Sequence, residues 1–298
     1  MANFEVRLWE KAPKRISLAL TIRENGTGRI VHEGTQTLTQ EQGAFRCTIP
    51  CGKVLTWHFD SPNLYRFEAI LLDEKQSGGT SSSTLGEKRV VLDIKAENFG
   101  FRTFTIEGNR FVLNGEPVRL PGIEDMPGSN LLYGMAEPHS YMEKTVHLMK
   151  ELNTTITRFH WAQDDYRLQL MDSLGILAQE EISWWQQPWD RLTPALRETA
   201  QRQLSELIEA HYNHPCLFAW GMSNEVGGNH EDLRWMADLT RRLDSTRIVE
   251  AMCNHIWRDL DRDPSLLLDL PTWNEYTGTW HAKHRDQLPG FFRQVEKV

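Results

Sequence analysis

The chain has 298 residues, of which 41 are acidic and 33 basic, and its formal net charge is −8. The basic residues form no cluster, so nucleic acid and anionic membrane surfaces are not expected partners. No apolar run approaches the roughly 20 residues that a membrane-spanning helix requires. Residues 1–13 carry four charged side chains where a secretion signal would be apolar, which favours a cytoplasmic location.

The first 107 residues show the pattern of β-strands. Apolar residues stand at every second position at Ile16, Leu18, Leu20 and Ile22, and again within 65–71. Clusters of Gly, Ser, Asn and Asp separate such runs and are typical of hairpin turns. Roughly seven strands in about 105 residues favour a β-sandwich of the immunoglobulin type, which we assign to residues 1–107.

Residues 108–298 change to an alternation of strands and helices. The expected strands cover 118–123, 155–161, 176–182, 217–225, 248–254 and 266–276. The expected helices cover 141–152, 165–174, 194–212, 231–243 and a segment near 287–296. Alternating β and α units predict a parallel sheet. The expected fold class is therefore multidomain, with a β-sandwich followed by α/β structure.

Polar, charged and aromatic residues stand at the carboxyl ends of four expected strands. They are Arg158, His160 and Trp161, then Glu180 and Glu181, then Asn224 and Glu225, and finally Asn274, Glu275 and Tyr276. A (β/α)8 barrel places its catalytic groups at this end of its strands. The chain has no Gly-x-Gly-x-x-Gly or Walker loop, and its four cysteines lack the spacing of a zinc site. We therefore expect neither a cofactor nor a metal.

The segment 214–225 carries the strongest chemical signal. A helix is expected to end at His214 and Pro215, an apolar strand follows, and that strand ends in Asn224 and Glu225. Partial burial at the rim of such a strand raises the pKa of a carboxyl group, and a glycosidase needs an acid that is still protonated near neutral pH. Asn224 can hydrogen-bond the 2-hydroxyl of a sugar. The alternative is that Glu225 only caps the following loop.

Three stretches, in the expected order, resemble family 2 glycoside hydrolases, which include β-galactosidases, β-glucuronidases and β-mannosidases. In 214–225, His-Pro, an apolar run with Trp and then Asn-Glu resembles the acid/base segment of the family. The stretch 153–181 is similar to the family's Asn-x-x-Arg-x-Ser-His-Tyr-Pro, Asp-x-x-Gly and Asp-Glu. The stretch 63–118 resembles its passage from the immunoglobulin-like domain to the barrel. The resemblance implies that residues 108–298 form a TIM-barrel catalytic domain that hydrolyses β-glycosides with retention.

The resemblance also implies roles for individual residues. Glu225 would be the general acid/base, and Glu181 would line the pocket floor. The substrate-binding candidates are Asn224, His160, Arg158, Glu181, Tyr276, Trp161 and Trp280, and the indole rings among them can stack on sugars. The sequence departs from the family at 159–162, where Phe-His-Trp-Ala replaces Ser-His-Tyr-Pro. It departs again at 122–127, which lacks the histidine common in β-galactosidases.

A retaining mechanism requires a second carboxylate, the nucleophile, about 5–5.5 Å from the acid. Glu275 is the candidate at the end of a late strand. However, the segment 273–280 is more similar to the family's Asn-x-Tyr-x-Gly-Trp stretch on the sixth strand. In that case Tyr276 would hydrogen-bond a nucleophile that comes later in the family sequence.

About six of the eight β/α units of a barrel are expected, so the barrel would be incomplete and would expose two strand edges. A second copy of the chain could cover them, which would make a homo-oligomer. Two rival functions stay open beside β-glycoside hydrolysis. One is a carbohydrate-binding or structural fragment without turnover, and the other is a metal-dependent barrel hydrolase that uses Glu180, Glu181, His160 and Glu225.

Overall fold

Two units divide the chain in the computed structural model, Met1–Arg102 and Thr103–Val298. The structure describes residues 2–8, 16–38, 44–73, 90–185, 192–226, 230–254 and 263–274, together with 276, 285–287, 289–290 and 293.

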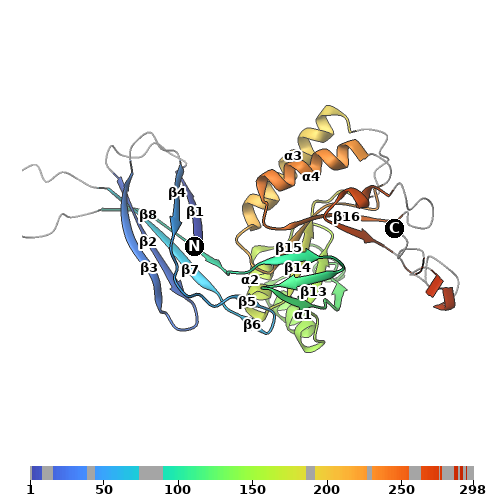
Figure 1. Cartoon of the computed structure of the whole chain (residues 1–298), viewed down its shortest axis with the longest axis horizontal. Coiled ribbons are helices and arrows are strands. Elements are labelled where there is room, and N and C mark those ends of the chain that lie inside the picture. Colours follow the sequence, from blue (N-terminus) through green and yellow to red (C-terminus); the bar gives the residue numbers. More distant parts are fainter. Residues whose placement is uncertain are drawn as a thin grey trace, which may run out of the picture. The chain divides into compact units, whose positions relative to one another are not determined.

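The first unit consists of antiparallel strands (Figure 1, blue to cyan). Its larger sheet has the order β3-β2-β7-β8 and contains β2 (Ile16–Glu24), β3 (Ile30–Leu38), β7 (Tyr65–Asp73) and β8 (Val90–Phe99). The smaller sheets pair β1 (Ala2–Arg7) with β4 (Ala44–Ile49), and β5 (Trp57–His58) with β6 (Ser61–Pro62).

The period-two pattern of the first unit has the predicted effect on burial. Ile16, Leu18, Leu20 and Ile22 are all buried on one face of β2. They share one apolar core with side chains of β1, β4 and β7, so the four-stranded sheet and the β1-β4 sheet contribute to the same core. The expectation of β-strands in this part of the chain is thereby confirmed.

A three-stranded antiparallel sheet opens the second unit. It has the order β11-β10-β9 and contains β9 (Phe104–Glu107), β10 (Arg110–Leu113) and β11 (Glu116–Val118). The boundary expected between residues 107 and 108 falls in the turn between β9 and β10, and the assignment of domains to 1–107 and 108–298 stays a prediction. Phe104 packs on Phe218 with ring centroids 5.0 Å apart, which attaches this sheet to the strand that carries Phe218.

Six parallel strands form the main sheet of the described second unit, in chain order. They are β12 (Gly122–Glu124), β13 (Ile156–Phe159), β14 (Leu177–Glu181), β15 (Leu217–Asn224), β16 (Ile248–Cys253) and β17 (Leu270–Trp273). Every residue of β14 and β15 is buried, as expected for central strands covered on both faces.

Helices connect these strands in the order that the sequence predicts. They are α1 (His139–Glu151), α2 (Asp165–Leu174), α3 (Pro194–His211) and α4 (His230–Leu243), with short 3-10 helices η2 (Pro264–Leu267) and η3 (Arg285–Gln287). Helix α1 packs on α2, and α3 packs on α4 (Figure 1). Within the described ranges, no helix has both the length and the apolar character needed to cross a membrane.

Local chemistry explains where the central helices begin and end. The hydroxyl of Thr193 accepts from the backbone N–H of Leu196, and Pro194 follows at the first helical position of α3. The carboxylate of Asp164 caps α2 by accepting from the backbone N–H of Tyr166. Gly175 ends α2 in the left-handed conformation, with φ of 71°.

Two of the expected strands were wrong in part. The segment 118–123 holds the end of β11 and the start of β12, which are separate strands on either side of Pro121. The two strands belong to different sheets, since β11 pairs with β10 and β12 pairs with β13. In the segment 266–276, Asp263 caps a 3-10 helix that begins at Pro264, and β17 starts only at Leu270.

Candidate active site

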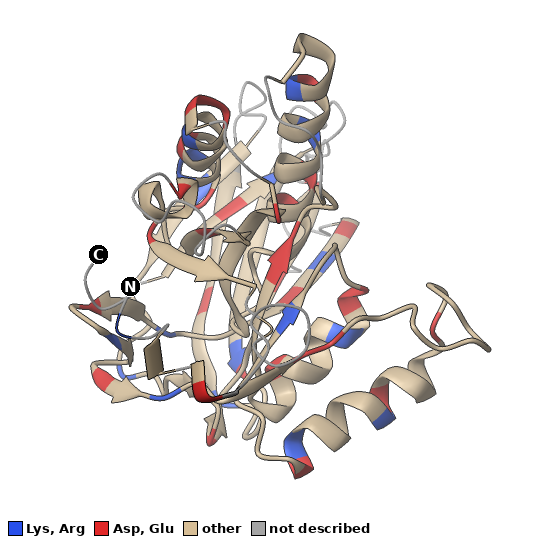
Figure 2. Ribbon diagram, turned by 90° about the vertical axis from the view of Figure 1, so that its right-hand side faces the viewer, with Lys and Arg blue, Asp and Glu red and all other residues tan. Residues whose placement is uncertain are grey.

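Four neighbouring strands bring charged and amide side chains to one end of the parallel sheet. Glu124 ends β12, Arg158 lies on β13, Glu181 ends β14 and Asn224 ends β15. Figure 2 shows acidic (red) and basic (blue) positions within the strands as well as on the helices. Because these strands are parallel, their carboxyl ends lie at the same edge of the sheet.

Arg158 is the centre of this group and is buried. Its Nη1 donates to Oε1 of Glu124 at 2.7 Å, and its Nη2 donates to Oε1 of Glu181 at 2.8 Å. The same Nη2 donates to Oδ1 of Asn224 at 2.7 Å. A guanidinium can hold three acceptors in one plane because its donors form a rigid fork. Arg158 therefore fixes side chains from three other strands.

His160 lies between the same two carboxylates. Its Nδ1 is 3.0 Å from Oε1 of Glu181, and its Nε2 is 3.3 Å from Oε1 of Glu124. The imidazole is almost buried and Glu181 is fully buried, whereas the side chain of Glu124 is 31% exposed. Arg158 and His160 thus form one polar cluster with Glu124 and Glu181.

Glu225 follows Asn224 directly and has a backbone φ of 53°, which is rare for a residue with a side chain. Its backbone N–H donates to the carbonyl of Met252 at 2.7 Å. The side-chain amide of Asn274 donates to Oε1 of Glu225 at 3.0 Å and to Oδ1 of Asn224 at 2.8 Å. A proton on the acid form of Glu225 therefore belongs on Oε2.

The amide of Asn224 is oriented by two donors. Its Oδ1 accepts from both Arg158 and Asn274, so this atom is the oxygen of the amide. The backbone N–H of Asn224 donates to the carbonyl of Trp184 at 2.8 Å. The one donor group of the side chain is then Nδ2, the group that a hydroxyl oxygen of a substrate would require.

Aromatic side chains lie beside this cluster. The ring of Trp161 is 5.8 Å from that of His160, and the ring of Trp185 meets His160 edge-on at 6.3 Å. Trp185 is 57% exposed. Burial raises the pKa of Tyr276, and the nearby carboxylates of Glu124 and Glu225 raise it further. Tyr276 therefore lies close to the acidic group that contains Glu225.

Glu180 points away from this cluster. Its Oε2 is 2.8 Å from Nδ1 of His211 on α3, and its Oε1 accepts from the backbone N–H of Gln163. Successive residues of a strand face opposite sides, so Glu180 and Glu181 serve different surroundings. This geometry argues against a metal-dependent hydrolase that would use both carboxylates in one ligand set.

The structure thus brings together Arg158, His160, Trp161, Glu181, Asn224, Glu225 and Tyr276 among the predicted site residues. Glu275 and Trp280 lie outside the described residues, so their roles stay predictions. Sequence reasoning missed Glu124, Trp185 and Asn274 as site residues. Position was the available signal for Glu124 and Asn274, because each ends or follows a strand of the sheet.

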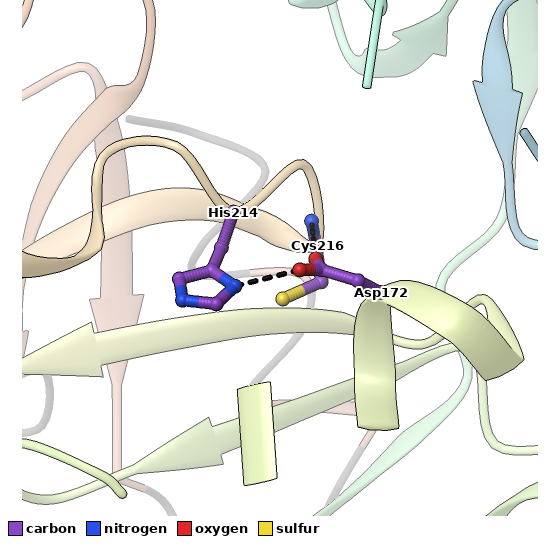
Figure 3. A group of neighbouring side chains, drawn as sticks. All are labelled: Asp172, His214 and Cys216. Atoms are coloured by element: carbon purple, nitrogen blue, oxygen red, sulfur yellow. Dashed lines mark hydrogen bonds and ion pairs between the residues drawn. The ribbon is translucent and has the colours of Figure 1, made fainter. Parts of the chain in front are cut away.

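A second polar group lies in the same unit, where α2 meets the start of β15 (Figure 3). One ligand atom each of Asp172, His214 and Cys216 lies within 4.8 Å of the others, an arrangement that could hold a metal ion. However, Nδ1 of His214 is 2.6 Å from Oδ2 of Asp172, and Oδ1 of Asp172 accepts from the backbone N–H of Cys216. These hydrogen bonds fasten the helix to the strand, and we read the group as structural.

Comparison with known proteins identifies the family. The family model for "Glycosyl hydrolases family 2, TIM barrel domain" matches residues 104–266. A β-galactosidase of Thermoanaerobacter pseudethanolicus is 30% identical over 239 residues, which cover 79% of this chain and 29% of that protein. A β-glucuronidase of Bacteroides fragilis is 28% identical over 217 residues, which cover 69% of this chain and 30% of that protein.

The structural comparison agrees. The crystal structure of Bacteroides uniformis β-glucuronidase superimposes with a TM-score of 0.83 at 26% identity, and the match covers 99% of this chain and 36% of that chain. This chain therefore spans about three tenths of the length of the two relatives named above. The family model covers more than half of the chain, including all of the strands β9 to β16. The chain belongs to glycosyl hydrolase family 2, and its second unit is TIM-barrel structure of that family.

Proposed function

We propose that this chain carries the acid/base part of a retaining β-glycosidase site, with Glu225 as the general acid/base. The observation that supports it best is the position of Glu225 between Asn224 and Asn274, at the carboxyl end of a buried parallel strand. A β-galactoside or β-glucuronide is the proposed substrate class, because the relatives are named for those activities.

In this proposal the acid form of Glu225 donates the proton on Oε2 to the glycosidic oxygen as the bond to the leaving group breaks. Asn274 holds Oε1 and so fixes the direction in which the proton points. Nδ2 of Asn224 binds the oxygen of the sugar 2-hydroxyl. Arg158, His160 and Glu181 form the floor beneath the sugar and hold Asn224 in place.

Retention also requires a carboxylate nucleophile about 5–5.5 Å from the acid. Glu275 remains the candidate nucleophile within this chain. In the other arrangement, the nucleophile comes from a later part of the family sequence and Tyr276 hydrogen-bonds it. If neither arrangement supplies a nucleophile, the same pocket binds carbohydrate without turnover. Trp185, Trp161 and Trp280 are the proposed aromatic surfaces for the sugar in both cases.

Turnover and binding measured side by side separate these functions. The 298-residue chain and its Glu225→Gln variant are assayed on a panel of p-nitrophenyl β-glycosides, and the free sugars are titrated by calorimetry. Hydrolysis that the variant loses supports the glycosidase. Binding without hydrolysis supports the carbohydrate-binding alternative. If a folded chain shows no hydrolysis and no binding, both proposed functions are contradicted.

Two features of the architecture belong to the proposal. We infer that the first unit is an immunoglobulin-like sandwich, because its four-stranded sheet and its β1-β4 sheet are antiparallel and share one core. We also propose that the edge strand β12 is covered by another strand, from a second copy of the chain or from a longer protein, since Ile123 on it is 43% exposed. Light scattering of the purified chain measures whether it is a homo-oligomer.

A further inference from the structure

A second carboxyl group lies buried beneath the candidate site. Glu250 is on β16 and is completely buried. One of its oxygens contacts Thr272 on the adjacent strand β17, and the other contacts Gln179 on β14, which lies beyond β15 in the sheet. Burial raises the pKa of Glu250 to about 8, and the negative charge of Glu181 raises it as well. The sequence Ile-Val-Glu-Ala-Met-Cys gives no sign of this role, because it resembles any apolar strand with one polar residue.

The hydrogen bonds of Glu250 fit a neutral carboxylic acid. Nε2 of Gln179 donates to its Oε1. Oγ1 of Thr272 lies 2.6 Å from Oε2 of Glu250 and 2.9 Å from the carbonyl oxygen of Ala251. The hydroxyl has one proton and the carbonyl can only accept. If Thr272 donates to Ala251, then Oε2 of Glu250 must donate to Thr272. In that case the hydrogen bonds run from Gln179 to Glu250, from Glu250 to Thr272 and from Thr272 to Ala251.

Gly221 brings the two buried carboxyl groups together. A Cβ atom on Gly221 would lie 2.6 Å from Oε1 of Glu250 and 2.9 Å from Oε2 of Glu181, and it would also collide with Cβ of Glu181. The side chains of Glu181 and Glu250 therefore both pack against the Cα atom of Gly221. Oε2 of Glu181 is buried without a hydrogen-bond partner among the described residues. Two ionised carboxylates in such a place repel each other strongly.

The surrounding charges decide which of the two keeps its proton. Glu181 pairs with the guanidinium of Arg158 at 2.8 Å, and Nδ1 of His160 lies 3.0 Å from the same carboxylate oxygen. Among the described residues, the hydrogen-bond partners of Glu250 are the neutral side chains of Gln179 and Thr272. The charged groups that act on it are Glu181 and Arg158, from β14 and β13, and Cys253 is the titratable neighbour on its own strand.

We propose that Glu250 is a positioning residue that acts as a neutral acid: it ties β14 to β17 and leaves Glu181 as the one buried anion that orients Arg158 and Asn224 beneath Glu225. Its importance for catalysis or sugar binding rests on the proposed function of the site. When Glu250 ionises, a second negative charge beside Glu181 draws Arg158 away from Asn224. The group then sets an alkaline limit for the site.

The substitution Glu250→Gln tests whether the side chain of Glu250 is protonated or ionised in the folded chain. A glutamine reproduces both hydrogen bonds of the protonated side chain, with its oxygen accepting from Gln179 and its amide donating to Thr272. A carboxyl group whose pKa is raised from 4.5 to about 8 takes up a proton on folding in this pH range. The free energy of unfolding of the wild type therefore falls as pH rises from 4.5 to about 8. The variant lacks this loss.

The first test is the unfolding midpoint of the wild-type chain, Glu250→Gln and a control, Glu198→Gln, across that pH range. Glu198 is exposed on α3. We expect the unfolding midpoint of Glu250→Gln to rise relative to that of the wild type as pH increases to about 8, and to remain higher above that pH. The midpoint of Glu198→Gln should follow that of the wild type. If Glu250→Gln is less stable at neutral pH and its stability depends on pH as that of the wild type does, Glu250 is not a neutral acid in the folded chain.

A spectroscopic measurement does not depend on whether Glu250→Gln folds. Infrared spectra of the Glu225→Gln chain with 13C-labelled glutamate, which lacks the proton that the proposed function assigns to Glu225, show whether another protonated side-chain carboxyl persists at neutral pH and disappears on alkaline titration. Its presence supports the proposal, and the lack of any such band at neutral pH overturns it.

The positioning role has its own readout, the pH profile of sugar binding, which unlike kcat/KM does not require the catalytic proton of Glu225. Glu250→Gln is expected to keep the neutral-pH value and to extend the profile to higher pH. A uniform loss at every pH would show a merely structural role and overturn the positioning claim. If the unfolding and infrared results are as expected but the chain neither binds nor hydrolyses any sugar, the proposed function has failed while the neutral acid stands.

Discussion

Nη2 of Arg158 lies 2.7 Å from Oδ1 of Asn224, although 66 residues separate the two in the chain. The contact passes over β14, and the same nitrogen donates to Glu181 on that strand. One cation therefore fixes the amide that stands beside Glu225.

Arg158→Ala is expected to destabilise the chain by about 3–5 kcal/mol, because it leaves the carboxylate of Glu181 buried without its cation. The free energy of unfolding in urea measures the effect. Arg202 is exposed on α3, and Arg202→Ala should change stability by less than about 0.5 kcal/mol. Equal effects of the two substitutions would contradict the role given to Arg158.

Gly221→Ala is expected to disturb the floor of the site, because the new methyl group would meet Cβ of Glu181 and Oε1 of Glu250. Overpacking of this kind costs about 1–3 kcal/mol, and sugar affinity should fall with it. Gly26→Ala is the control, since a Cβ there meets no atom within 4 Å. Thermal unfolding of both variants compares the two positions, and an unaffected Gly221→Ala would show that the floor can move.

His214 links α2 to the start of β15 through Asp172 and Asp165. Burial alone would lower the pKa of His214, but hydrogen bonds and charges of these two aspartates outweigh it and raise the pKa above 6.5. The stabilisation is therefore complete below the unfolded pKa and is lost as pH rises through the raised folded value.

The substitution His214→Gln tests this link. The wild-type chain should lose stability as pH rises above the ordinary histidine range, and the variant should be less stable at low pH and lack that loss. The exposed residue His147 provides the control His147→Gln. Unfolding midpoints across pH decide, and an unchanged pH dependence in His214→Gln would show that His214 is neutral in the folded chain.

Trp185→Ala is expected to weaken sugar binding by about 0.5–1.5 kcal/mol, the contribution typical of an aromatic contact. The fold should be unaffected, because Trp185 is 57% exposed. Calorimetric titration with the sugar that binds best measures the loss, and Tyr212→Ala, at an exposed aromatic residue after α3, is the control. Unchanged affinity would remove Trp185 from the pocket.

The sequence predicted the parts of the structure that local rules determine. Thr193, Pro194 and Gly175 begin or end helices through bonds within a few residues, so the bounds of α2 and α3 were close to those expected. The strand expected across Pro121 was wrong, because the two segments pair in different sheets. Pairing between strands is a long-range property that a short apolar run does not reveal.

The candidate site followed the same division. The rule that barrels place chemistry at the carboxyl ends of strands found Arg158, His160, Glu181 and Glu225. Glu250 escaped it, because its importance comes from a glycine on the next strand and from Gln179 and Thr272 on two others. Trp184 and Trp185 look alike in the sequence, yet one is buried and the other exposed.

The most direct test of the account is the dependence of Glu225→Gln on the leaving group. The wild-type chain, Glu225→Gln and Glu198→Gln are assayed on β-glycosides of 4-nitrophenol and of the more acidic 2,4-dinitrophenol. General acid catalysis contributes about 10²–10⁴-fold, so Glu225→Gln should lose that factor on the poorer leaving group and much less on the better one. Equal losses on both substrates, or none, would contradict Glu225 as the acid/base.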